Sequence, residues 1–124
     1  MLLVFFGSGL GGLCRWGVYL GCTKFFGTGF PVGTVLVNIL GCLAVGILII
    51  PLAGNGAERE HWRLGLLIGF LGGFTTFSTF GRETVELSQD GNQTAAIGNV
   101  LLSVGLGLFA VWVGTRIGTR LMPG

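Results

Sequence analysis

Long apolar segments without charge, separated by short polar segments, set the pattern of this chain. Charged side chains are absent from Phe25 to Ala57 and again from Leu64 to Gly81. A helix needs roughly 20 consecutive apolar residues to cross a hydrocarbon core of about 30 Å. The pattern therefore predicts an all-α membrane protein, a single integral membrane domain over residues 1–124. Four transmembrane helices per subunit are expected, at about residues 2–24, 32–52, 63–88 and 95–117.

The third of these segments departs from a plain membrane helix between Gly69 and Phe80, where it reads G-F-L-G-G-F-T-T-F-S-T-F. Two adjacent glycines restrain the backbone little, and the Thr and Ser hydroxyls that follow can bond backbone groups outside a regular helix. We therefore expect the helix to break near its centre, at residues 72–76. Irregular backbone at this depth is tolerated only where it is buried in protein or lines an aqueous cavity, so a break marks a site.

Two kinds of group at this break can bind ions. Freed carbonyl oxygens can coordinate a cation, as they do in the unwound helices of transporters. Phe77 and Phe80 are three residues apart and face one way if the helix resumes, and the positive edges of their rings can meet a poorly hydrated anion. Glycine, phenylalanine and small hydroxyls also pack membrane helices closely, so a purely structural role for this stretch stays open.

Polar side chains also recur at helical spacing in the second and fourth spans. Thr34 and Asn38 are four residues apart, and so are Asn99 and Ser103, so each pair shares a helix face. An amide in a span either bonds a neighbouring helix or lines a polar path with its two N–H donors. Arg15 lies well inside the first span, where a charge usually faces a bundle interior or an aqueous vestibule.

The composition is typical of a membrane protein and argues against nucleic-acid binding, a disulfide framework, a zinc site and serine-based catalysis. Of the 124 residues, 51% are hydrophobic and 10% are charged, and the mean hydropathy is +0.82. The net charge of +2, without a basic cluster, gives no support for nucleic acid as a partner. The three cysteines lack the paired spacing of a disulfide framework or a zinc site. His61 is the one histidine and lies in a polar loop, so a serine nucleophile has no base and we expect no enzyme.

A chain of four spans is too small to enclose a path by itself. Each polar face supplies only half of a lining, so we expect a homo-oligomer surrounded by membrane lipid. Positive charge is divided between Arg59, Arg63, Arg116 and Arg120 on the side of both termini and the second loop, and Lys24 and Arg82 on the other. Because the asymmetry of Lys and Arg fixes orientation during insertion, this modest bias specifies the orientation only weakly.

Four blocks of sequence carry a family likeness: G-G-L-C-R-W at 11–16, G-T-V-L-V-N-I-L-G at 33–41, G-G-F-T-T-F-S-T-F at 72–80 and N-V-L-L-S at 99–103. With these blocks the chain resembles the Fluc (CrcB) fluoride channels in all four spans, in order and over its full length. The T-T-F-S-T-F core is the most specific part. The resemblance implies a passive, multi-pass channel in a prokaryotic plasma or inner membrane that exports fluoride and so lowers its cytoplasmic concentration.

The same resemblance implies an assembly and a set of site residues. Members of the family are homodimers whose subunits insert antiparallel, with two fluoride pores and a central structural Na+. The Na+ ligands implied for this chain are the carbonyls of Gly72 and Thr75. The implied pore residues are Phe77 and Phe80 as ring-edge phenylalanines, Asn38 as the amide that holds one of them, and Thr76, Ser78, Thr79, Ser103 and Arg15.

Three other kinds of membrane protein are the alternatives. A small multidrug-type exporter also has four spans in a dimer, but it needs an embedded carboxylate in span one, and the first acidic residue here is Glu58. A membrane lipid kinase needs acidic residues to hold Mg-ATP, and Glu83 and Glu86 occur without a phosphate-cradling loop. The third alternative is a membrane subunit that transports nothing itself. In such a subunit the polar helix faces would serve only to pack the helices together. Anion flux by the purified protein alone separates that alternative from a channel.

Overall fold

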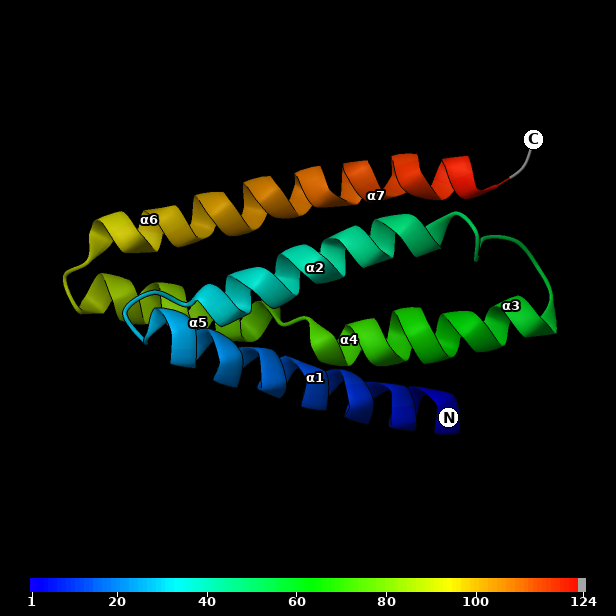
Figure 1. The fold of residues 1–124 in the computed structure, drawn as a ribbon, viewed down its shortest axis with the longest axis horizontal. Helices are drawn as coiled ribbons and strands as arrows, with labels where there is room; N and C mark the ends of the chain where they lie inside the picture. Colours follow the sequence, from blue (N-terminus) through cyan, green and yellow to red (C-terminus); the bar gives the residue numbers. More distant parts are fainter. Residues whose placement is uncertain (123–124) are drawn as a thin grey trace.

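The computed structural model describes residues 1–122, which form helices joined by short connections (Figure 1). This part of the chain contains no strand. Within residues 1–122, four segments are long and apolar enough to cross a membrane: Leu2–Phe26, Val32–Ile49, Ala57–Gln89 and Gln93–Leu121. The predicted all-α architecture with four helices capable of spanning a membrane is therefore confirmed.

The first two spans are the helices α1 (Leu2–Phe26) and α2 (Val32–Ile49). α1 ends at Gly27, whose φ of 73° lies in the left-handed region that favours glycine. α2 ends three residues before the predicted limit of its span. Pro51 follows in a turn, and it has no N–H with which to continue the helical hydrogen bonds.

The other two spans are each assembled from several helical pieces. The third contains α3 (Ala57–Trp62), the π-helix η1 (Arg63–Leu71), α4 (Gly72–Phe74) and α5 (Phe77–Gln89). The fourth contains α6 (Gln93–Leu101), the π-helix η2 (Leu102–Leu106) and α7 (Gly107–Leu121). Asn92 starts the fourth span as an N-cap, because its Oδ1 accepts a hydrogen bond from the Ala95 N–H at 3.1 Å.

The four segments run side by side (Figure 1). α2 packs against α7, and α1 packs against η1, α4 and α2. The N-terminus, α3 and the end of α7 lie at one end of the bundle, whereas the α1–α2 connection and the α5–α6 turn lie at the other. This arrangement places α2 beside the junction of α4 and α5, where the site residues of the third span lie.

Glycines allow the helix backbones to touch. A Cβ atom on Gly114 of α7 would overlap the Leu43 carbonyl of α2 and lie 2.8 Å from the Cα atom of Gly46. A Cβ atom on Gly11 of α1 would overlap the Phe70 carbonyl in the same way. Small residues at helix interfaces permit this approach in membranes. Because the backbones of α2 and α7 are in direct contact at Gly46 and Gly114, α2 cannot slide along its axis relative to α7 without a steric clash.

The backbone at the predicted break differs from the expectation in one respect. Gly72 has helical angles, with φ of −62° and ψ of −38°, and it forms α4 with Gly73 and the next residue. The expectation that this glycine pair unwinds is wrong. A Cβ atom on Gly73 would overlap the carbonyl of Ser8 on α1, so this glycine serves close packing instead. The residues with extended backbone are Thr75 and Thr76.

Candidate functional site

Two extended residues separate α4 from α5. Thr75 has φ of −89° and ψ of 159°, and Thr76 has φ of −153° and ψ of 120°. Thr75 remains tied to the preceding helix, because its N–H and its Oγ1 both donate to the Leu71 carbonyl, at 3.0 and 2.9 Å. Its methyl group lies where a Cβ atom on Gly41 of α2 would stand. The chain therefore leaves helical geometry for two residues and resumes it at Phe77.

Asn38 of α2 replaces the helical hydrogen-bond partners of Thr76. Its Nδ2 donates to the Thr76 carbonyl, and its Oδ1 accepts from the Thr76 N–H, both at 2.8 Å. An amide suits this position because it carries a donor and an acceptor in one plane. An unpaired backbone group in a membrane interior costs several kcal/mol. The paired bonds therefore stabilise the extended backbone directly before Phe77, the residue implied as a pore phenylalanine.

The interruption also diverts two N–H groups from their helical acceptors. In a continuous helix the Thr76 N–H would bond the Gly72 carbonyl, but it donates to Asn38 Oδ1. The Thr79 N–H would bond the Thr75 carbonyl, but it donates to Thr76 Oγ1 at 3.2 Å. The two carbonyl oxygens implied as cation ligands have therefore lost their usual donors.

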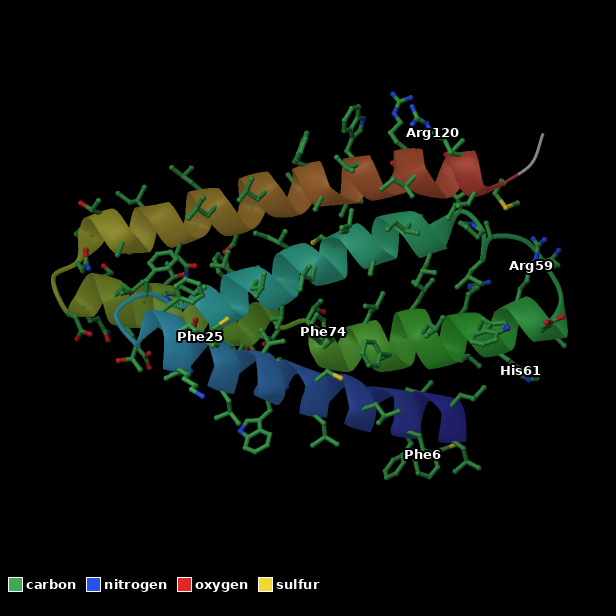
Figure 2. All side chains as sticks on the ribbon, viewed as in Figure 1. Phe6, Phe25, Arg59, His61, Phe74 and Arg120 are labelled. Carbon is green, nitrogen blue, oxygen red and sulfur yellow. The ribbon has the colours of Figure 1, made fainter. Side chains whose placement is uncertain are left out.

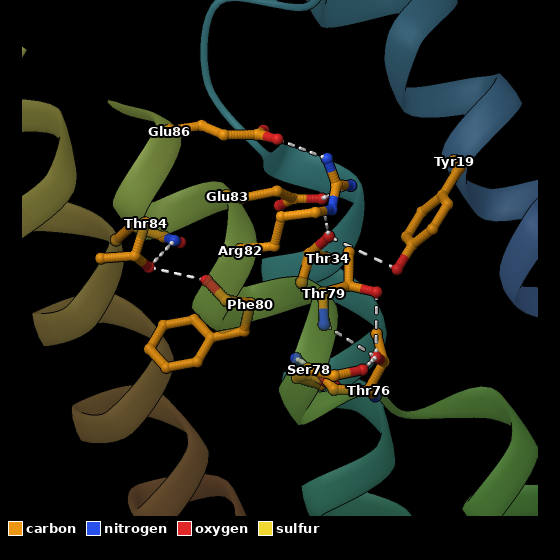
Figure 3. Close-up of polar contacts among 12 residues, drawn as sticks. Tyr19, Thr34, Thr76, Ser78, Thr79, Phe80, Arg82, Glu83, Thr84 and Glu86 are labelled. Atoms are coloured by element: carbon orange, nitrogen blue, oxygen red, sulfur yellow. Dashed lines mark hydrogen bonds and ion pairs between the residues drawn. The ribbon is translucent and has the colours of Figure 1, made fainter. Parts of the chain in front are cut away.

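The hydroxyl groups implied for the pore gather at the start of α5 (Figure 3). Thr76 is the N-cap of this helix, since its Oγ1 accepts from the Thr79 N–H. The same Oγ1 donates to Thr79 Oγ1 at 3.0 Å and lies 3.5 Å from Ser78 Oγ. Thr76 is buried and Ser78 is exposed. The cluster therefore reaches from the interior of the chain to its surface.

Phe77 and Phe80 lie together on α5, as their spacing predicts. Their ring centroids are 5.6 Å apart and their planes are inclined at 45°. The Phe77 side chain is 82% exposed in the single chain, whereas Phe80 is half-buried. Figure 3 shows the Phe80 ring pointing away from the hydroxyl cluster. One chain therefore does not bring the Phe80 ring and the hydroxyls into a single lining.

Ser103 belongs to a second hydrogen-bond network. Its Oγ donates to Asn99 Oδ1 at 3.4 Å, and Asn99 Nδ2 donates to Thr84 Oγ1 at 2.9 Å. Thr84 Oγ1 in turn donates to the Phe80 carbonyl at 2.7 Å. Asn99 is completely buried. The fourth span thus holds the backbone of Phe80, and Ser103 acts on it through two intermediate side chains instead of joining the hydroxyl cluster.

Arg15 lies apart from both networks. It is a half-buried residue of α1, and within residues 1–122 it makes neither a side-chain hydrogen bond nor an ion pair. The structure therefore connects the implied residues of the second, third and fourth spans, but it does not connect Arg15 to them.

The sequence raises Glu83 only as an acidic residue that a lipid kinase would need, whereas the structure places it next to the site. Thr34 Oγ1 donates to Glu83 Oε1 at 2.8 Å and lies 3.4 Å from the Tyr19 hydroxyl. The other carboxylate oxygen, Oε2, is buried and has no hydrogen-bond partner among residues 1–122. The available signal is spacing: Glu83 follows Thr79 by four residues, just as Asn38 follows Thr34.

A hollow of about 600 Å³ opens beside this carboxylate, between α1, α2 and α5. Its lining includes Tyr19, Thr34, Arg82, Glu83 and Glu86. Arg82 bonds Glu86 at 2.8 Å and lies 3.9 Å from Glu83 (Figure 3). Polar and charged groups of both signs therefore line a recess that begins one helical turn from Asn38.

Known proteins resemble nearly the whole of this chain. Residues 2–115 match the family model described as CrcB-like protein, Camphor Resistance (CrcB). A protein named fluoride-specific ion channel FluC from Coxiella burnetii (strain Dugway 5J108-111) is 47% identical over 98% of both chains. A protein of the same name from Solibacter usitatus (strain Ellin6076) is 41% identical over 96% of this chain and 98% of its own. A third protein of this name, from Chloroflexus aurantiacus (strain ATCC 29366 / DSM 635 / J-10-fl), is 42% identical over 95% of this chain and 94% of its own.

These relatives are named as ion channels and not as enzymes, in agreement with the expectation from the sequence. The four apolar helices, together with relatives from bacteria, make this chain a multi-pass protein of a prokaryotic membrane. Since the family model covers residues 2–115 and the relatives match at nearly full length, the chain belongs to the CrcB family.

Proposed function

We propose that this protein is a passive, fluoride-selective ion channel that exports fluoride and lowers its concentration in the cytoplasm. The observation that carries the proposal is the pair of hydrogen bonds between Asn38 and Thr76. This pair holds an extended backbone in an apolar span and presents phenylalanine rings and hydroxyl groups next to it. Relatives that are up to 47% identical bear the name fluoride-specific ion channel.

The chemistry of these groups suits a small anion. Hydroxyl groups donate hydrogen bonds that can replace those of the hydration shell, and phenylalanine ring edges carry a positive potential. Neither group carries a full charge. Because conduction requires an ion to bind well enough to enter and weakly enough to leave, neutral donors suit a channel better than a cationic side chain does.

A second copy of the chain completes the path. The Phe77 side chain is 82% exposed, and in one chain the Phe80 ring points away from the hydroxyl cluster. In an antiparallel homodimer, each pore receives rings from one copy and polar groups from the other. The dimer then holds two equivalent pores that run in opposite senses, with the broken third helices meeting near the middle of the membrane.

The carbonyl oxygens freed at the interruption could hold a structural Na+ between the two copies. The Gly72 and Thr75 carbonyls would hold it, because their helical donors are bonded elsewhere. Neutral oxygen ligands suit a hard monovalent cation. A bound Na+ would supply positive charge that balances the carbonyl dipoles.

The hollow beside Glu83 is the aqueous mouth of the path. Water in a recess of about 600 Å³ can bond the buried Oε2 of Glu83, which no described side chain satisfies. Thr34 lines this recess and lies one helical turn from Asn38. The recess therefore leads from the membrane surface toward the hydroxyl cluster.

A multidrug-type exporter and a non-transporting subunit receive less support. The described α1 carries no carboxylate for proton exchange. The relatives bear the name of a channel, which favours transport over a purely structural role.

Phe77→Ile and Phe80→Ile should each slow fluoride flux at least about tenfold, the equivalent of about 1.4 kcal/mol in the barrier. Isoleucine fills much of the space of the ring but lacks its positive edge. Fluoride efflux from liposomes measures the effect, and size-exclusion chromatography verifies the dimer. Phe6→Ile, at an exposed position of α1, is the matched control. If both site variants conduct at the parental rate, the rings do not line the pore.

Asn38→Asp should reduce fluoride flux to near the protein-free level. The change removes the donor to the Thr76 carbonyl, and a buried acceptor left unpaired costs about 1–3 kcal/mol. An ionised carboxylate would also repel the anion. Asn55→Asp makes the same chemical change at an exposed position outside the helices and should leave flux unchanged. If Asn38→Asp conducts fluoride at the parental rate, Asn38 is not needed for the pore and serves only in helix packing.

Antiparallel insertion predicts equal labelling from the two sides of the membrane. In a background with Cys14, Cys22 and Cys42 replaced by alanine, Asn55→Cys places one thiol in the exposed second loop. An impermeant thiol reagent should then modify comparable amounts from outside and inside, because the Lys and Arg bias is small. Permeabilised membranes give the total. Labelling from one side alone contradicts the antiparallel dimer, while the pore itself is judged by flux.

A further inference from the structure

The outer face of α7 carries a strip of side chains that the proposed channel does not use. Phe109, Trp112, Arg116 and Arg120 recur at intervals of three or four residues, so they follow one face of the fourth span. All four are exposed, while Gly114 on the opposite face packs against α2. Figure 2 shows Arg120 pointing away from α2 near the end of α7.

Contacts within the strip hold its groups in place. The guanidinium carbon of Arg116 lies 5.2 Å from the centre of the Trp112 ring, within the range of a cation–π interaction. Phe109 stacks on Trp112 with ring centroids 5.9 Å apart and planes inclined at 28°. Arg116 and Arg120 are four residues apart, which separates their Cβ atoms by about 5–6 Å. Two guanidinium groups at this spacing can bond the oxygens of one phosphate.

The charge of this strip is not balanced by acidic residues of its own span. Asp90 is the last acidic residue of the sequence, so α6 and α7 contain no carboxylate. Elsewhere in the described chain, Arg63 pairs with Glu60 at 3.3 Å and Arg82 pairs with Glu86 at 2.8 Å. The end of the fourth span therefore attracts an anion from outside the chain.

The shape and order of the groups indicate an amphipathic anion. A shallow hollow of about 430 Å³ is lined by Trp112, Val113, Arg116, Ile117 and Arg120. Along the helix axis, Phe109, Trp112 and Val113 come first, and Arg116 and Arg120 follow toward the end of the span, with Ile117 between the two arginines. A membrane lipid has the same order, with an acyl chain followed by a phosphate, and tryptophan favours the level at which the two meet.

We propose that this face of α7 binds one anionic phospholipid per chain. Arg116 and Arg120 bond its phosphate, Val113 and Trp112 lie beside its glycerol region, and Phe109 contacts the start of an acyl chain. A zwitterionic lipid fits less well, because its ammonium group would lie beside two guanidinium groups. The site is separate from the proposed pore residues, so it can fail while the channel proposal holds.

Native mass spectrometry of the purified dimer, titrated with phosphatidylglycerol or phosphatidylcholine, tests this proposal. The parental protein should retain phosphatidylglycerol in preference, saturating at one molecule per chain. The double variant Arg116→Gln/Arg120→Gln should bind it roughly 30-fold more weakly, since each arginine near an anionic lipid contributes a factor of about five. Arg116→Lys/Arg120→Lys should be intermediate, because lysine keeps the charge but loses the planar fork and the stacking.

The double variant Arg59→Gln/Arg63→Gln is the matched control. It removes the same charge at the same end of the molecule, where Figure 2 shows Arg59 near the end that holds Arg120, and it should bind as the parent does. Fluoride flux verifies that each variant is folded. Equal retention of the two lipids, or an equal loss in the control, overturns the proposal. Dissociation of the dimer by Arg116→Gln/Arg120→Gln also overturns it, because the face would then bind a second copy.

Discussion

Extended backbone inside a membrane span requires a replacement for the helical hydrogen bonds that it loses, and here Asn38 supplies it. One amide satisfies both the N–H and the carbonyl of Thr76, at 2.8 Å each. Three features of the third span accompany this exchange of hydrogen-bond partners. The Thr76 side chain is free to cap α5, the carbonyls of Gly72 and Thr75 lose their helical donors, and Phe77 begins a new helix.

The rest of the bundle holds that amide and that helix in register. Interlocked backbones at Gly46 and Gly114 fix α2 against the fourth span. The buried Asn99 then reaches from the fourth span, through Thr84, to the carbonyl of Phe80. α5 is thus held by an amide from each side. At Thr76 a side chain with both a donor and an acceptor is needed, because the hydrocarbon interior offers no water to satisfy the backbone groups that have left the helix.

Features that depend on the length or the helical spacing of one segment were predictable from the sequence. Contacts between residues far apart in the sequence were not. Apolar length gave the four spans, and the interval of three gave the Phe77–Phe80 pair. The unwinding of Gly72 was wrongly expected, because local freedom of glycine does not reveal the packing of the neighbouring Gly73 against Ser8. The partner of Asn38 and the recess beside Glu83 depend on how α2, α1 and α5 are placed, which no spacing within one helix reports.

The claim that this chain alone forms a fluoride-selective path is tested most directly by ion efflux from liposomes that contain only the purified protein. With equal gradients of fluoride and chloride, and an ionophore to balance charge, we predict rapid fluoride efflux and chloride efflux no faster than from protein-free liposomes. Absence of fluoride efflux would contradict the account, and so would chloride efflux at a comparable rate, because neutral ring edges and hydroxyls would then not be selecting the ion.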